Sequence, residues 1–272
     1  MDVGALRDAV TVVLGLAMGV LSGVFGVGGG VISQPGMRAM GIEPLIVIGT
    51  ALPVIIPGAL SGTIRYTKER LIRWDAVIAT VPFGLAAAVV GGVLSDRVPG
   101  DGHLLQLLTA TLLGVSARRM ATLRAPVTDE PLAETDAPEA PDADGHGTGT
   151  PREYAAIGAS AGLLSGLLGI GGGVLMVPAF VQFAGFRVKQ AIATSLACVG
   201  AFAVPGTITH VALDHVDWRV AVALVAGVIP GARLGAVLTI RANDARLRMV
   251  VGVFLGVTAV LYAAGELNAL LT

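Results

Sequence analysis

The chain has 272 residues, of which 54% are hydrophobic and only 14% are charged, and its mean hydropathy is +0.80. This composition excludes a soluble globular protein and predicts an all-α polytopic membrane protein. Most apolar runs are about 17 to 25 residues long, whereas the strands of a membrane β-barrel are shorter and alternate between apolar and polar residues. A single cysteine, Cys198, excludes an intramolecular disulfide and a cysteine-built metal site.

Two halves follow one another along the chain, each with a glycine-interrupted apolar segment and three further apolar runs. In the first half, residues 1–124, we interpret as helices the runs Ala9–Val27, Val31–Met40, Pro44–Ile64, Trp74–Leu94 and Leu104–Val115. In the second half, residues 152–272, the corresponding runs are Tyr154–Leu168, Val174–Phe186, Ala191–Val211, Trp218–Ile240 and Leu247–Ala264.

An acidic stretch, residues 125–151, separates the halves. It carries seven Asp or Glu residues and no Lys or Arg, so the net charge of −1 for the whole chain leaves +6 for the remainder. Because it cannot bury apolar surface, we expect a disordered cytoplasmic linker.

One sequence motif occurs in both halves, at Gly19–Pro35 and again 143 residues later at Gly162–Pro178. A match of this length predicts an internal duplication. Three consecutive glycines inside an apolar run also indicate a break in a helix, because each glycine lowers helix stability by about 1 kcal/mol relative to alanine.

The positions of Lys and Arg favour one membrane topology. If each glycine segment is a re-entrant hairpin, only Arg7, Arg38, Arg97 and Arg219 lie outside, and thirteen other cations of the loops lie inside. The alternative, four spanning segments in each half, gives ten cations inside against seven outside. The hairpin topology makes the halves inverted repeats with both termini outside, and it places a substrate site near the midplane at the broken helices.

The breaks themselves predict an anion site. A helix that begins inside the bilayer presents unpaired N–H groups and the positive end of its dipole, and such backbone must be buried in protein or line a watery cavity. We expect a small anion and the lipid bilayer as partners, with no nucleic acid and no cofactor. The candidate substrate-binding residues are Gly28, Gly29, Gly30, Ser33, Thr50, Gly171, Gly172, Gly173, Thr194 and Arg233.

Each of these residue types also has a purely structural interpretation. Glycines spaced four apart, such as Gly15 and Gly19, form ridges for close helix packing. Hydroxyls such as those of Ser22 and Ser165 commonly bond to the preceding turn of their own helix. Arg233, inside an apolar run, either lines a pathway or extends to the membrane interface. Cys198 is expected to be a packed thiol, and His210 a helix-end imidazole.

The doubled GxGGGxxxxP pattern, at Gly26–Pro35 and Gly169–Pro178, and the PGARLGA stretch at Pro230–Ala236 resemble the TauE/SafE sulfite exporter family. The resemblance spans both halves and leaves out only the linker. It implies transport, with export as the implied direction, of sulfite, organosulfonates or related small sulfur-containing anions across the cytoplasmic membrane. The pattern is specific to the family and not to one substrate, so another small anion stays an alternative.

Other classes of protein fit the sequence less well. GVGGGV and GIGGGV lack the last glycine of a dinucleotide-binding GxGxxG loop and the GK[ST] ending of a phosphate loop. An enzyme is not expected, because no paired acids, activated nucleophile or His and Cys cluster is visible. A membrane scaffold without transport activity would explain the packing glycines but not the two equivalent breaks.

Overall fold

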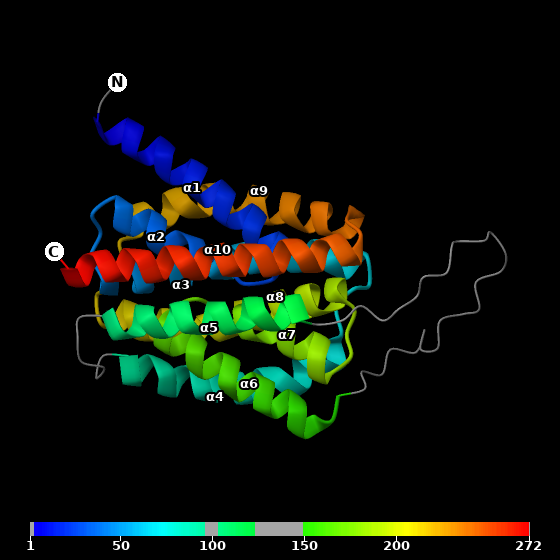
Figure 1. Ribbon diagram of the computed structural model, residues 1–272. Coiled ribbons are helices and arrows are strands. Elements are labelled where there is room, and N and C mark those ends of the chain that lie inside the picture. Colours follow the sequence, from blue (N-terminus) through cyan, green and yellow to red (C-terminus); the bar gives the residue numbers. More distant parts are fainter. Residues whose placement is uncertain (1–2, 96–102, 123–148, 272) are drawn as a thin grey trace.

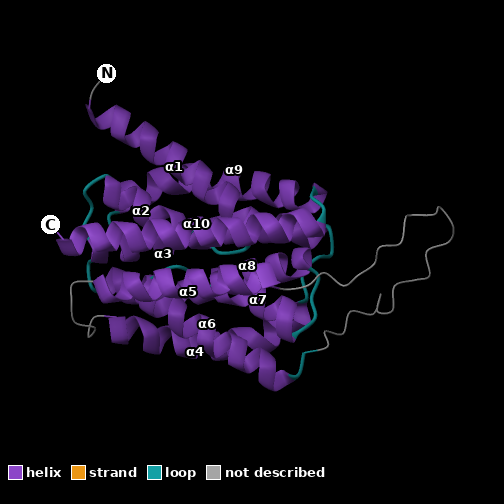
Figure 2. Ribbon diagram, in the orientation of Figure 1, coloured by secondary structure: helices purple, strands orange, loops and turns teal. Residues whose placement is uncertain are grey.

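The computed structural model describes residues 3–95, 103–122 and 149–271, so the predicted linker lies almost wholly outside the described residues and stays a prediction. These residues form ten α-helices and no β-strand (Figures 1 and 2). The helices are α1 (Val3–Phe25), α2 (Gly30–Ala39), α3 (Pro44–Lys68), α4 (Trp74–Ser95), α5 (His103–Thr122), α6 (Pro151–Leu168), α7 (Gly173–Phe183), α8 (Val188–Ala212), α9 (Trp218–Arg241) and α10 (Asp244–Leu271).

Local sequence signals explain several helix starts. Pro44 is the first residue of α3, where its missing N–H would have no helical partner in any case. Thr150 and Glu153 form a capping box at the start of α6. The Asp217 carboxylate accepts a hydrogen bond of 3.1 Å from Val220 N at the start of α9.

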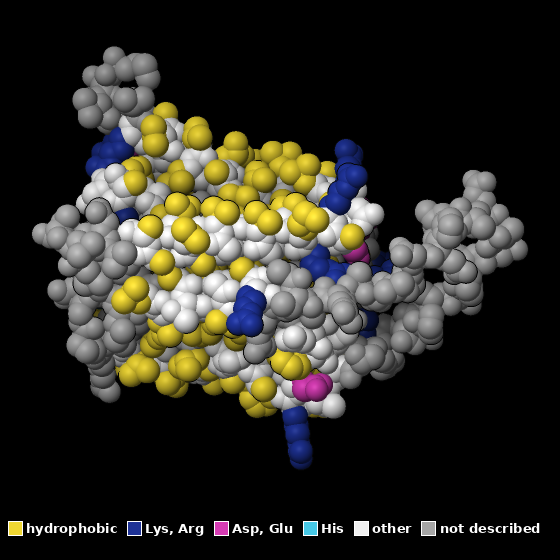
Figure 3. All heavy atoms as spheres, viewed as in Figure 1, with side chains coloured by type: hydrophobic (Ala, Val, Ile, Leu, Met, Phe, Trp, Pro, Cys, Tyr) yellow, Lys and Arg dark blue, Asp and Glu magenta, His cyan; other side chains and the backbone are white. Residues whose placement is uncertain are grey.

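Within the described residues, six helices are long and apolar enough to cross a membrane: α1, α3, α4, α8, α9 and α10. Five of these match predicted spans. The sixth predicted span was α5, but its strongly apolar part, Leu107–Arg118, is too short to qualify. Helix α1 qualifies in its place, through Arg7–Phe25. Outward side chains such as Ile78 and Met249 are 72% and 70% exposed, and Figure 3 shows hydrophobic side chains along the outer helix faces. Such a surface is suited to lipid.

Both glycine-interrupted segments are helical hairpins. In the first, the Thr11 hydroxyl of α1 lies 3.8 Å from Met40 Sδ just past α2, so α2 returns alongside α1. In the second, the Tyr154 ring at the start of α6 lies 6.4 Å from Phe180 near the end of α7. The two hairpins open toward opposite ends of the bundle, and Figure 1 shows α1 starting at the same end at which α10 finishes.

The hairpins pack against the other half of the chain through glycines. Gly15, Gly19 and Gly23 of α1 face backbone carbonyls of α9, and a Cβ atom at any of them would collide with that backbone. The corresponding glycines of α6 face α4 in the same way, at Gly158, Gly162 and Gly166. The prediction of packing ridges is therefore confirmed.

Helices α3 and α8 lie at the centre of the bundle. In their apolar segments 61% of residues are buried, against 28% for α4 and α10. Helices α3 and α8 contact each other. In addition, α3 contacts α9, α8 contacts α4, and α5 packs against α10. Every one of these pairings joins one helix of the first half to one of the second. The two glycine breaks therefore lie in a core that neither half builds alone.

Candidate functional site

The two breaks meet inside the bundle. A Cβ atom on Gly30 would lie 2.6 Å from the carbonyl oxygen of Gly169, and one on Gly173 would collide with the carbonyl oxygen of Gly26. All four glycines are buried. The segments 26–30 and 169–173 therefore run antiparallel in direct backbone contact, which only glycine permits at these positions.

The backbone at the breaks is left-handed. Gly28 and Gly29 have φ of 80°, and Gly171 and Gly172 have φ of 84° and 69°. L-residues other than glycine rarely adopt this conformation, so the predicted helix interruptions are confirmed, with their cause. Gly30 and Gly173 differ from the other candidate glycines because they are the first residues of α2 and α7.

Helices α2 and α7 begin without a side-chain cap. Their N-cap residues are Gly29 and Gly172, which have no side chain to accept a hydrogen bond from the first N–H groups of the helix. Ser33 is buried next to one of these ends, and its hydroxyl donates to the carbonyl of Gly30 at 3.1 Å. The two positive helix ends suit a negatively charged ligand.

Carbonyl groups at the ends of α1 and α6 would oppose an anion, but side chains from other helices bond to them. The carbonyl of Gly23 accepts from Tyr66, that of Val24 from Thr239 at 3.3 Å, and that of Gly26 from Ser195 at 2.9 Å. These bonds reduce the negative potential that α1 contributes at the break.

The carbonyl of Leu168, the last residue of α6, is satisfied by a single residue of the other hairpin. Gln34 Nε2 donates to it at 2.7 Å, and the Tyr262 hydroxyl lies 3.1 Å from Gln34 Oε1 and 2.9 Å from the Val31 carbonyl. Sequence reasoning missed this role. The available signal was the departure from the repeat, because the second copy of the motif has Val177 where the first has Gln34.

Two buried hydroxyls near the breaks are unused. Ser22 and Ser165 are 2% and 0% exposed, and neither hydroxyl has a hydrogen-bond partner among the described residues. Each serine lies one turn before a break, and its own carbonyl accepts from Gly26 N or Gly169 N. The alternative that these hydroxyls bond to their own preceding turn is therefore wrong. An unpaired buried hydroxyl is destabilising unless a ligand or water supplies a partner.

Apolar side chains cover the middle of both breaks. A Cβ atom on Gly171 would lie 2.8 Å from Val199 Cγ1 and 3.5 Å from Ile55 Cδ1, and Gly28 faces the same two side chains. Ile55 comes from α3 and Val199 from α8, and both are buried. Of the two environments open to such backbone, protein or a watery cavity, the structure has protein at the middle of the breaks, where Ile55 and Val199 lie.

The remaining candidate residues are not gathered at the breaks. The Thr50 hydroxyl accepts from Asp217 N at 3.0 Å, and the Thr194 hydroxyl accepts from Arg73 N at 3.1 Å, so these threonines hold the starts of α9 and α4. Arg233 is exposed on the outward face of α9, which corrects the expectation that it would contact the anion site. The two preceding residues of α9, Gly231 and Ala232, are buried.

Comparisons with known proteins agree with the glycine motif. Residues 11–262 match the protein family described as "Sulfite exporter TauE/SafE". The "Probable membrane transporter protein YunE" of Bacillus subtilis is 27% identical, over 90% of this chain and 93% of that protein. MamO of Paramagnetospirillum magneticum, with the same transporter description, is 31% identical over 95% of this chain but only 44% of its own length. A "Probable membrane transporter protein" of Xylella fastidiosa is 29% identical over 85% of each chain. No solved structure matches significantly.

Proposed function

Because the chain belongs to the sulfite exporter TauE/SafE family of multi-pass membrane transporters, we propose that it exports a small sulfur-containing anion, such as sulfite or an organosulfonate, across the cytoplasmic membrane. The observation that carries this proposal is the backbone contact between the two breaks from which the uncapped helices α2 and α7 begin inside the bundle. Two positive helix ends that begin at one buried backbone contact favour an anion more than one end alone.

Backbone and hydroxyl donors form the proposed site. The N–H groups around Gly28–Gly30 and Gly171–Gly173 bind the anion, and the hydroxyls of Ser22 and Ser165 add two donors that have no other use in the described structure. Sulfite and sulfonates carry several acceptor oxygens on one sulfur atom, so they can accept hydrogen bonds from both helix ends. Charge-assisted bonds of this kind are stronger than neutral ones.

The same proposal includes the architecture of the transporter. We infer that the halves are inverted repeats, each with one re-entrant hairpin and three spans, that the N- and C-terminal ends face outward, and that residues 125–151 are cytoplasmic. The reciprocal pairings of α1 with α9 and of α6 with α4 support this, as do hairpins that open to opposite ends. Labelling of a cysteine at Asp2 in a Cys198→Ser background tests it, and reaction from the cytoplasmic side would reject it.

The structure corresponds to a closed state in this mechanism. Ile55 and Val199 cover the breaks, so the anion reaches the site only after α3 or α8 shifts relative to the hairpins. Alternating movement of one repeat against the other around a fixed site is the general mechanism for transporters with inverted repeats.

Purified protein in liposomes tests the function directly. We expect efflux of sulfite or of an organosulfonate from a panel of small anions. Ser22→Ala and Ser165→Ala should raise the KM without lowering stability, because neither hydroxyl has a partner among the described residues. Ser160→Ala is the matched control, since that hydroxyl bonds within its own helix α6. Release of no anion from the panel by folded protein would favour the scaffold, and selective release of an anion without sulfur would change the substrate class.

A further inference from the structure

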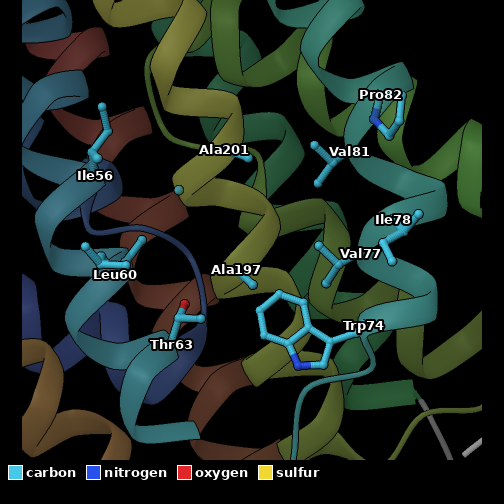
Figure 4. A pocket seen from close by; sticks show the side chains of 12 residues that line it. Ile56, Leu60, Thr63, Trp74, Val77, Ile78, Val81, Pro82, Ala197 and Ala201 are labelled. Carbon is cyan, nitrogen blue, oxygen red and sulfur yellow. The ribbon is translucent and has the colours of Figure 1, made fainter. Parts of the chain in front are cut away.

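A lateral cleft of about 560 Å³ opens between α3 and α4, with α8 as its floor (Figure 4). Leu60 and Ile78 stand on its two sides and are 59% and 72% exposed, and the floor is made of small residues that include Ala197 and Ala201. Because these outer faces contact lipid in a membrane, the cleft is open to the bilayer and not to water. Its volume lies within the range of about 300 to 1,000 Å³ that is usual for ligand sites.

The length of the cleft matches a lipid chain of one leaflet. Thr63 and Trp74 lie at one end of it, and Ile56 and Pro82 lie toward the other (Figure 4). Seven or eight residues of helix separate these ends, which is about 10 to 12 Å. One leaflet of the hydrocarbon core is about 15 Å thick, so the cleft extends from the interface most of the way to the midplane. Trp74 is 48% exposed at the interfacial end, where tryptophan is commonly found.

Positive charge lies directly beyond that end. Lys68 is the last residue of α3, and Arg70 lies in the loop from α3 to α4. Both are exposed, and neither side chain has an ion pair or hydrogen bond among the described residues. The neighbouring Arg65 is paired with Glu69 at 2.7 Å and Arg73 with Asp75 at 3.5 Å, so these two cations are already partly neutralised. Two cations without partners at the mouth of an apolar cleft complement a phosphate headgroup joined to an acyl chain.

We propose that this cleft binds an anionic phospholipid, with one acyl chain between α3 and α4 and its phosphate beside Lys68 and Arg70. The proposal depends on the membrane location of the chain and not on the transported substrate. The cleft is lined almost entirely by apolar side chains, so a free anion would find donors only at the end with Thr63 and Trp74. An acyl chain fills this apolar space, and a negative headgroup accounts for the charge at the mouth.

Native mass spectrometry of the full-length protein with phosphatidylglycerol and phosphatidylcholine tests the proposal. We expect the wild type to retain phosphatidylglycerol preferentially. A Lys68→Gln/Arg70→Gln double variant should lower that preference about 25-fold, from about fivefold for each cation near a membrane surface. The matched control is Arg241→Gln/Arg246→Gln, which removes two exposed cations at the same end of the bundle, away from the cleft. Equal loss in both double variants would overturn the proposal, because the effect would then be one of overall charge.

Occupancy of the cleft is tested separately by filling it. Ala201→Phe should abolish retention of phosphatidylglycerol, whereas Val257→Phe on the exposed face of α10 should leave it unchanged. Leu60→Trp, on the α3 side of the cleft, serves the same purpose if the first variant does not fold. Undiminished retention in both cleft variants would refute the site. Loss of a dimer signal in them would identify a second copy of the chain as the occupant, and displacement of the lipid by an organosulfonate would identify the substrate; either result would overturn the proposal.

Discussion

Alanine substitutions at the two N-cap glycines should have different consequences, although the positions correspond in the duplicated motif. Both residues have left-handed backbone, with φ of 80° at Gly29 and 69° at Gly172. A Cβ atom at Gly29 would have no neighbour closer than 3.5 Å, whereas one at Gly172 would collide with the carbonyl oxygen of Ala161 in α6. The first variant adds only backbone strain, and the second adds strain and a collision with backbone.

These environments give the expected magnitudes. An L-residue in the left-handed region costs about 1 to 2 kcal/mol, so Gly29→Ala should lower the free energy of unfolding by that amount. Overpacking against a close backbone costs about 1 to 3 kcal/mol more, so Gly172→Ala should lower it by about 2 to 5 kcal/mol. Denaturant unfolding in detergent measures both values. Equal stability of the two variants would refute the close approach of Gly172 to α6.

Transport measured per folded molecule separates this strain from function. Gly41→Ala is the matched control, because Gly41 has φ of 79° in the loop after α2 and a Cβ atom there would have nothing within 4 Å. We expect Gly41→Ala and Gly29→Ala to lose similar stability, and only Gly29→Ala to lose efflux of the transported anion. If Gly29→Ala and Gly41→Ala transport equally well per folded molecule, the anion does not bind at the break.

Three further predictions concern side chains around the breaks. Ile55→Ala opens space over Gly28 and Gly171 and should increase passive anion leak through liposomes, whereas Ile64→Ala, on the outer face of the same helix, should not; equal leak would mean that Ile55 is not a barrier. Gln34→Leu leaves the Leu168 carbonyl without its donor and should lower the free energy of unfolding by about 1 to 3 kcal/mol, and an unchanged midpoint would show that another donor replaces it. Arg233→Ala should keep the wild-type efflux rate per molecule, because the side chain is exposed on the outer face of α9; a large loss would show that Arg233 reaches the pathway during transport.

The sequence allowed accurate prediction of features that depend on local chemistry or on repetition. Three consecutive glycines strongly disfavour a helix, so the breaks at Gly28–Gly30 and Gly171–Gly173 could be located without any tertiary information. Glycines spaced four apart on α1 form one face of the helix, so they predicted close packing, and α9 supplies the opposing backbone.

Features that depend on distant side chains could not be predicted. The hydrogen bond from Gln34 to Leu168 joins residues 134 positions apart, and that from Ser195 to Gly26 joins residues 169 apart. No pattern along the chain indicates which hydroxyl or amide reaches which carbonyl, because that depends on how the two halves dock. Thr50 and Thr194 illustrate the same limit: their matching positions in the halves are visible in the sequence, but their bonds to the starts of α9 and α4 are not.

The side chains that cover the breaks also make the halves unequal in the proposed transport cycle. On α8, Ser195 bonds to the carbonyl of Gly26, and Val199, one turn later, covers Gly171. A shift of α8 would therefore break a hydrogen bond and remove Val199 from both Gly28 and Gly171 in one movement. On α3, Ile55 makes the equivalent cover, but Ala51 stands where α8 has Ser195 and has no hydroxyl to lose. The bond of α3 to the first hairpin comes instead from Tyr66, whose hydroxyl donates to the carbonyl of Gly23. An opening through either helix therefore breaks one hydrogen bond, about 0.5 to 1.5 kcal/mol, but only the bond of α8 lies at the break itself.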